Sequence, residues 1–126
     1  MTRVIAIGVG CRKGCKADAI EAVARQALAD VRGEPVGVFT LADKRDEAGL
    51  AEAARRLGLG LTFLPRDALH EREGEVLTRS EAAARAFGVA SVAEAAALAG
   101  AGPGSVLIVP RIAADGATCA VAETRP

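Results

Sequence analysis

A glycine-rich stretch with two basic residues is the part of this sequence whose residue types and spacing could do chemistry. Residues 8–15 read GVGCRKGC; they follow an apolar run and precede an amphipathic one, the pattern of a strand, a turn and a helix. Gly8, Gly10 and Gly14 allow positive φ angles and close approach of a ligand, although their spacing is neither the dinucleotide fingerprint nor a Walker loop. N–H groups at a helix start favour an anion, and Arg12 and Lys13 add positive charge. The stretch predicts an anion site, with a solvated basic turn as the alternative.

The cysteines follow no metal-binding or disulfide pattern. Cys11 and Cys15 are spaced C-x-x-x-C, Cys119 stands alone in a predicted strand, and His70 is the single histidine. A nucleophilic Cys11 is conceivable, because a helix N-terminus and basic neighbours would lower the pKa of its thiol. A nucleophile of this kind needs a base, and no sequence signal places His70 beside it. We expect no metal and no cofactor.

A second charged loop, residues 43–47, comes directly after the predicted strand 36–42. The carboxyl ends of parallel strands share one edge of a sheet, so this loop should lie beside the glycine-rich stretch. We therefore expect one crevice with Arg12, Lys13 and Lys44 at its edge and Arg45 as a further candidate. The alternative is a solvated turn whose acidic residues favour the N-terminus of the following helix.

Two glutamates are candidates for acid–base chemistry as well as for helix capping. Glu81 and Glu94 complete the capping-box patterns Thr78-x-x-Glu81 and Ser91-x-x-Glu94, which is the simpler interpretation of each. Either carboxylate could instead face the crevice and act as a general base for a water molecule. Arg111, just past a predicted strand, is either a further anion contact or a surface cation.

Apolar periodicity predicts the elements that must position these residues. Strands are expected at residues 3–9, 36–42, 61–64, 105–110 and 117–122, and helices at 16–31, around 50–57, at 78–87 and at 91–98, with one helical turn at 66–71 and an exposed loop at 71–75. Asp115-Gly116 predicts the turn of a closing hairpin. We expect a single α/β domain over residues 1–126, a three-layer α/β/α arrangement with a mixed, mainly parallel sheet of about five strands.

The composition excludes several classes of protein. The chain has 126 residues, a formal net charge of zero, three Phe and no Trp or Tyr, which argues against a nucleic-acid-binding surface. We see neither an apolar run long enough for a membrane helix nor a signal-peptide pattern, so we expect a cytoplasmic protein. The odd number of cysteines argues against a disulfide framework.

Four motifs, in order along the chain, resemble those of the CobE proteins, which are similar to the C-terminal domain of CbiG. They are GVGCRKG at 8–14, KRDEAGL at 44–50, Ser80-Glu81 and GVASVAEAAA at 88–97. The family often has Ser or Thr where this chain has Cys15, and Lys where it has Arg111. Cys15 is therefore a poor candidate for essential chemistry, whereas Arg111 keeps the positive charge.

The resemblance implies a role in cobalamin (vitamin B12) biosynthesis at the corrin-ring stage. Precorrins carry acetate and propionate carboxylates, which a basic crevice would bind by charge-assisted hydrogen bonds. The expected binding residues are Gly10, Cys11, Arg12, Lys13, Gly14, Lys44, Ser80 and Arg111. The alternatives are a hydrolase that opens a precorrin lactone, with Glu81 or Glu94 as general base, and a partner module for another corrin-pathway enzyme.

Overall fold

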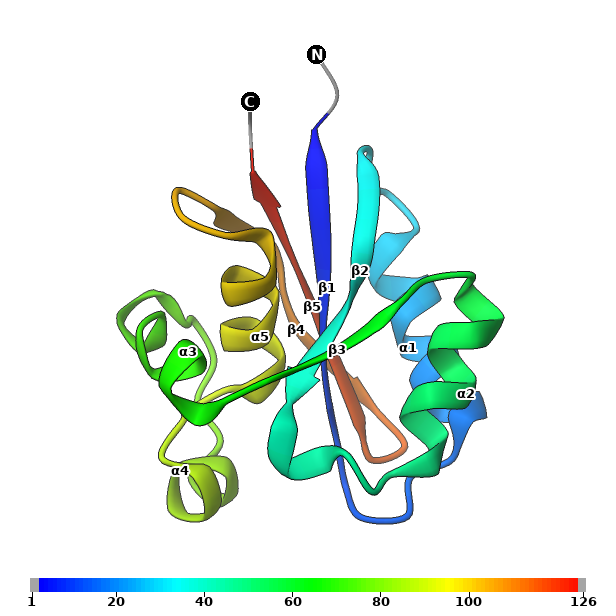
Figure 1. Ribbon diagram of the computed structural model, residues 1–126, viewed down its shortest axis with the longest axis horizontal. Helices are drawn as coiled ribbons and strands as arrows, with labels where there is room; N and C mark the ends of the chain where they lie inside the picture. Colours follow the sequence, from blue (N-terminus) through cyan, green and yellow to red (C-terminus); the bar gives the residue numbers. More distant parts are fainter. Residues whose placement is uncertain (1–2, 125–126) are drawn as a thin grey trace.

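A five-stranded mixed sheet forms the centre of the structure, a computed structural model that describes residues 3–124 (Figure 1). The strands are β1 (Val4–Cys11), β2 (Glu34–Leu41), β3 (Leu61–Leu64), β4 (Val106–Ala114) and β5 (Ala117–Thr124), in the order β3-β2-β1-β5-β4. β1 pairs with β2, and β2 with β3, in parallel, whereas β5 pairs antiparallel with both β1 and β4. The prediction of a mixed sheet is confirmed, but the expectation that it is mainly parallel is wrong, because β5 inserts between β1 and β4.

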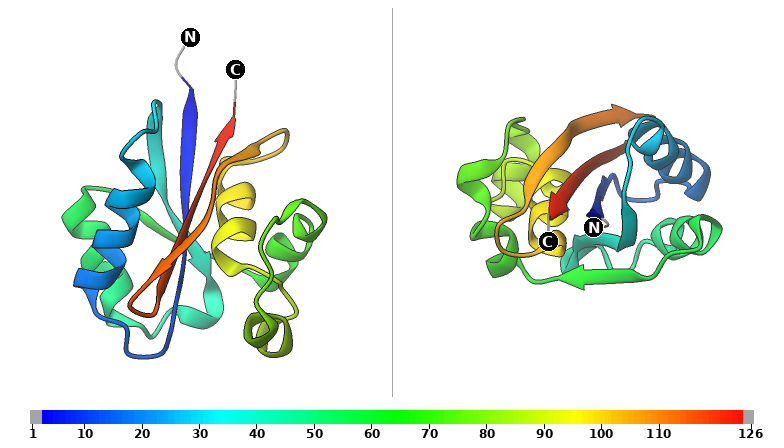
Figure 2. Two further views of the ribbon diagram at one scale, coloured as in Figure 1. Left: turned by 180° about the vertical axis from the view of Figure 1, so that it is seen from behind. Right: turned by 90° about the horizontal axis from the view of Figure 1, so that it is seen from above.

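Helices lie on both faces of this sheet. α1 (Ala17–Leu28) and α2 (Ala48–Leu57) cover one face, and α5 (Val92–Ala101) covers the other (Figures 1 and 2). α3 (Arg66–His70) and α4 (Glu81–Phe87) lie outside α5, and the short 3-10 helices η1 (Ala42–Lys44) and η2 (Glu73–Glu75) complete the described elements. Figure 1 shows the β1–α1 loop, the β4–β5 turn and α4 at the end of the molecule away from the two termini.

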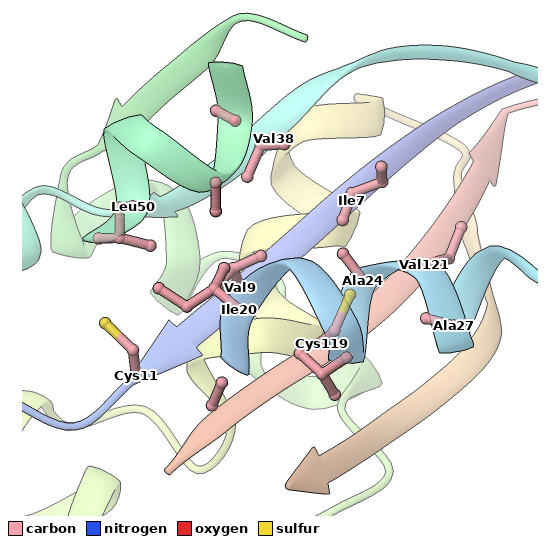
Figure 3. Close-up of a cluster of buried hydrophobic side chains, with 14 of the residues drawn as sticks. Ile7, Val9, Cys11, Ile20, Ala24, Ala27, Val38, Leu50, Cys119 and Val121 are labelled. Carbon is pink, nitrogen blue, oxygen red and sulfur yellow. The ribbon is translucent and has the colours of Figure 1, made fainter. Parts of the chain in front are cut away.

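The two faces of the sheet carry side chains of different size. Ile7 and Val9 of β1 and Val121 of β5 point toward α1, where they pack with Ile20 in the main core cluster (Figure 3). The alternate positions, which face α5, are small: Ala6, Gly8, Gly10, Ala120 and Ala122. α5 consequently approaches the sheet closely with its own alanines, and seven of its residues, from Val92 to Leu98, are buried.

This close approach corrects the role predicted for two glycines. β1 runs through Cys11, so Gly8 and Gly10 lie inside the strand, and of the three glycines in this stretch only Gly14 has a positive φ, of 77°. A Cβ on Gly8 would overlap the backbone carbonyl oxygen of Ala93 in α5. Gly8 is therefore required by helix–sheet packing, and the turn begins later than the sequence predicted.

Residues 71–75 differ from the sequence prediction, and the turn at Asp115-Gly116 agrees with it. Residues 71–75 were expected to be an exposed loop, but Arg72 is half-buried and its guanidinium donates to the carbonyl oxygens of Leu98, Gly102 and Ser105 at the end of α5. The predicted hairpin turn is confirmed, with φ angles of 53° at Asp115 and 86° at Gly116.

Within residues 3–124 no single helix is long and apolar enough to cross a membrane. α4 and α5 meet these criteria of length and composition only when taken together, and they are bent by 65° relative to one another. α5 is buried against the sheet.

Candidate functional site

A cleft of about 680 Å³ lies where the β1–α1 loop, η1, α4 and the β4–β5 hairpin meet; we call it the basic cleft. Its cations come from three separate parts of the chain: Arg12 follows β1, Lys44 ends η1, and Arg111 belongs to β4. The other lining residues are Gly10, Cys11, Ser80, Ala82, Ala83, Ala86, Phe87, Val92, Ala113, Ala114, Asp115, Gly116, Ala117 and Thr118.

Most residues that the sequence singled out for binding meet at this cleft. Those that line it are Gly10, Cys11, Arg12, Lys44, Ser80 and Arg111. Lys13 and Gly14 do not, and Gly14 instead lines shallower hollows beside Cys15. Lys13 and Gly14 lie outside the cleft because β1 is longer than predicted. The backbone N–H of Arg12 still donates to the Gly116 carbonyl oxygen of the hairpin, at 2.9 Å, and the loop leaves the cleft after Arg12.

The cleft cations have no carboxylate partner within the described part of the chain. Among the residues that the structure describes, no carboxylate oxygen lies within 4.0 Å of Arg12, Lys44 or Arg111. Several arginines elsewhere are paired; Arg66, for example, lies 2.7 Å from Asp43. Asp115 supplies one negative charge to the lining, so the cleft has an excess of positive charge and can bind an anion without first breaking an ion pair.

Phe87, the last residue of α4, holds that helix beside the cleft. The Lys44 ammonium lies 4.8 Å and the Arg66 guanidinium 5.6 Å from the centre of its ring. Both distances are within the range of cation–π attraction. α4 thus contributes an apolar wall to the cleft, and one of the cleft cations is in contact with that wall.

Glu94 is buried behind the cleft and accepts hydrogen bonds from three neighbouring residues. Its carboxylate accepts from the N–H groups of Leu77 (2.7 Å) and Thr78 (2.9 Å), from the Thr78 hydroxyl (2.8 Å) and from the Arg111 N–H (2.9 Å). Burial alone would raise the pKa of this carboxyl, but these hydrogen bonds outweigh it, and the pKa lies below its usual value.

The two capping-box predictions fare differently. Ser91 caps α5, accepting from the Glu94 N–H at 3.3 Å, but the Glu94 side chain does not reach back to Ser91, since it is used by the donors above. Ser80, and not Thr78, caps α4 by accepting from the Ala83 N–H at 3.2 Å. The predicted Thr78–Glu81 capping box is therefore wrong, since the residue that caps α4 is Ser80, two positions after Thr78.

Neither glutamate lines the basic cleft. Glu81 has 91% of its side chain exposed and lies 3.7 Å from Arg85 on the surface of α4. Glu94 is fully buried. The general-base role of either residue stays a prediction to which this geometry adds nothing.

The cysteine chemistry suggested by the sequence is not favoured. Burial raises the pKa of the Cys11 thiol to about 11, and the opposing effect of Lys44 is smaller. Burial likewise raises the pKa of Cys119 to about 12. The expectation that a helix start would lower the pKa of Cys11 is wrong, because Cys11 lies in β1 and 8% of it is exposed. His70 does not line the cleft, and its Nε2 lies 3.3 Å from the carbonyl oxygen of Phe87.

The anion site predicted at the start of α1 already has a carboxylate of its own. Glu47, just before α2, accepts a hydrogen bond from the Gly14 N–H at 2.6 Å. Gly49, near the start of α2, allows that helix to pack closely against the β1–α1 loop, since a Cβ on Gly49 would overlap the carbonyl oxygen of Cys15. The positive charge available to a ligand is thus on the cleft side of the loop.

Sequence reasoning missed the apolar half of the cleft. Ala82, Ala83 and Ala86 follow helical spacing on one side of α4, which was a signal for a helix face but not for what that face would border. Thr118 and Asp115 were likewise missed, because only the folded hairpin brings them into the lining of the cleft.

The comparisons with known proteins agree on one family. Residues 5–122 match the family model described as "Cobalamin synthesis G C-terminus". Protein CobE of a Sinorhizobium species is 32% identical over 121 residues, which cover 94% of this chain and 79% of that protein.

Two solved structures are also similar. One is CobE, described as a protein from the cobalamin (vitamin B12) biosynthetic pathway, with a TM-score of 0.90, 35% identity, and coverage of 99% of this chain and 93% of that one. The other is the cobalamin biosynthesis protein chiG from Agrobacterium tumefaciens str. C58, with a TM-score of 0.76, 41% identity, and coverage of 97% and 99%.

Proposed function

Because this chain belongs to the CbiG C-terminal / CobE family of cobalamin-biosynthesis proteins, we propose that it binds a precorrin-type tetrapyrrole in the basic cleft. The observation that carries the proposal is a set of three cations, Arg12, Lys44 and Arg111, that line one cavity from three parts of the chain and have no carboxylate partner among residues 3–124. Acetate and propionate groups on the rim of the macrocycle are their complement. Each contact is a charge-assisted hydrogen bond, the stronger kind in proteins.

The apolar lining supports the same ligand class. A tetrapyrrole is a broad, largely apolar ring, and Ala82, Ala83 and Ala86 of α4 offer a wall with no bulky side chain in its path. Phe87 ends this wall. A small, fully polar anion such as phosphate would leave it in contact with water, so the lining favours an amphipathic polycarboxylate.

The polar side chains of the cleft contact such a ligand in different ways. Arg12 and Arg111 present planar guanidinium groups suited to paired hydrogen bonds with a carboxylate, and Lys44 acts as a point charge. The Ser80 hydroxyl, which accepts from Ala83, keeps its own hydrogen for donation to a ligand.

The test is to incubate the purified protein with a panel of precorrin intermediates and to follow absorbance and mass. A shifted spectrum with unchanged mass, saturating as protein is added, is the expected result. A changed mass would instead identify an enzyme, and the fragment lost or gained would name the reaction. An unchanged spectrum across the panel would overturn the proposal and favour a partner module.

A further inference from the structure

The buried carboxylate of Glu94 bonds to two segments that line the basic cleft. One contains Arg111, and the other runs from Thr78 to the lining residue Ser80. Glu94 accepts from the backbone N–H of Arg111, which supplies a cation to the cleft, at 2.9 Å. It also accepts from the N–H and hydroxyl of Thr78 at 2.9 Å and 2.8 Å, two residues before Ser80. Strand β4 and the segment that leads into α4 therefore meet at a single side chain of α5.

Four donors hold the two oxygens of the carboxylate. Oε1 accepts from Leu77 and Thr78, and Oε2 accepts from the Thr78 hydroxyl and from Arg111. Among residues 3–124 no side-chain nitrogen of a Lys or Arg lies within 4.0 Å of the carboxylate, so neutral donors and the N-terminal end of α5 stabilise its charge. Replacing this group by any neutral side chain must leave at least one donor unpaired.

Apart from the packing of Ala83 and Phe87 against a core cluster and the contact of Phe87 with Lys44, α4 has few attachments to the rest of the fold. Figure 1 and Figure 2 show α4 at the edge of the molecule, outside α5 and away from the sheet. None of its residues is fully buried. Its position relative to β4 depends on these contacts and on the chain before and after it, and Glu94 holds the chain before it.

We propose that Glu94 is a positioning residue of the basic cleft: by holding Arg111 of β4 and Thr78 before α4, it sets the distance between the two walls that a bound precorrin must touch. This inference rests on the proposed function for its ligand. It assigns Glu94 no contact with the ligand and no proton transfer.

The decisive variant is Glu94→Gln, which keeps the size of the side chain. A glutamine can accept with its carbonyl oxygen from Leu77 and Thr78, and the Thr78 hydroxyl can reverse to accept from its amide. The backbone N–H of Arg111 cannot reverse and loses its acceptor. We expect faster amide hydrogen exchange at Arg111 and an affinity for the precorrin that falls about tenfold, while exchange in β1 stays unchanged.

The matched control is Glu123→Gln, which alters another buried glutamate, in β5, whose carboxylate lies 3.4 Å from Arg3 and which does not line the cleft. It should change stability and leave affinity at the wild-type value. A merely structural Glu94 would behave in the same way. The combined variant Glu94→Gln/Arg111→Ala should lose less affinity than the product of the single losses, because Glu94 acts in part through Arg111.

Wild-type affinity in Glu94→Gln, or additive losses in the combined variant, would overturn the inference. If Glu94→Gln does not fold, Thr78→Val removes only the hydroxyl donor and should weaken binding in the same direction. If the wild-type protein binds no member of the panel, the proposed function fails first, and the inference fails with it. A wild-type protein that binds, with unaffected variants, removes the inference alone.

Discussion

The ammonium group of Lys44 lies 4.8 Å from the centre of the Phe87 ring, so a cation of the basic cleft directly contacts the helix that forms its apolar wall. Lys44 is in η1 and Phe87 is the last residue of α4. The contact is made at the C-terminal end of α4, whereas Glu94 holds Thr78, before the N-terminal end. Together, the two attachments hold α4 in place at the cleft.

Phe87→Leu keeps an apolar side chain but removes the aromatic face. We expect the free energy of unfolding to fall by about 1 kcal/mol, measured by urea denaturation, since exposed cation–π pairs contribute about 0.5–1 kcal/mol. In a Lys44→Met background the same change should cost less, because part of the interaction is already lost. Equal losses in both backgrounds would show that Lys44 contributes nothing.

Gly8→Ala tests the close packing of α5 on β1. The added Cβ would overlap the backbone of Ala93, which cannot move without shifting the helix, so we expect a loss of about 3 kcal/mol or more in unfolding free energy. Gly74→Ala is the matched control, because no atom lies within 4 Å of the Cβ it would add and its φ is not positive. A Gly8→Ala protein as stable as the control would contradict the packing described here.

Glu94 predicts a specific pH dependence of stability. Its folded-state pKa is below the ordinary value of 4.5, because hydrogen bonds favour the charged form more strongly than burial disfavours it. The stabilisation is therefore complete above pH 4.5 and is lost as pH falls through the folded-state pKa. The stability difference between wild type and Glu94→Gln, from urea titrations at a series of pH values, should shrink in that acidic range. A difference that stays constant would be inconsistent with this account.

Cys11 should be slow to alkylate, although it lies beside Lys44. Burial raises the pKa of its thiol to about 11, so the thiolate is scarce near neutral pH. Peptide mass spectrometry after iodoacetamide treatment should show Cys11 modification rising only as the pH approaches that value. Lys44→Met should slow it further, since Lys44 favours the thiolate. Rapid modification at neutral pH would restore Cys11 as a candidate nucleophile.

The sequence predicted the local parts of the fold well. The unit of β1, α1 and β2 follows from two apolar runs separated by an amphipathic one, and Asp115-Gly116 marked the closing hairpin. The position of β5 could not be predicted, because its antiparallel pairing with β1 joins residues more than 100 positions apart, such as Val4 and Thr124, and no local pattern encodes it.

For the candidate site, the sequence predicted the charged residues that line the cleft better than the apolar residues that form its wall. Arg12, Lys44 and Arg111 were each noted as possible anion contacts, and they do line one cleft. Lys13 was grouped with them because the end of β1 was placed two residues early. The burial of Glu94 was not predictable, since its donors come from Thr78 and from Arg111, on segments whose approach depends on the tertiary fold.

The most direct test of the central claim is the precorrin affinity of Arg12→Ala/Lys44→Ala, measured by absorbance titration beside wild type. The control, Lys16→Ala/Arg45→Ala, removes the same charge from exposed residues that do not line the basic cleft. We predict that the cleft variant loses roughly a hundredfold in affinity, about tenfold for each charged contact, and that the control loses little. A folded cleft variant that binds like wild type, or a control that loses as much, would contradict the account.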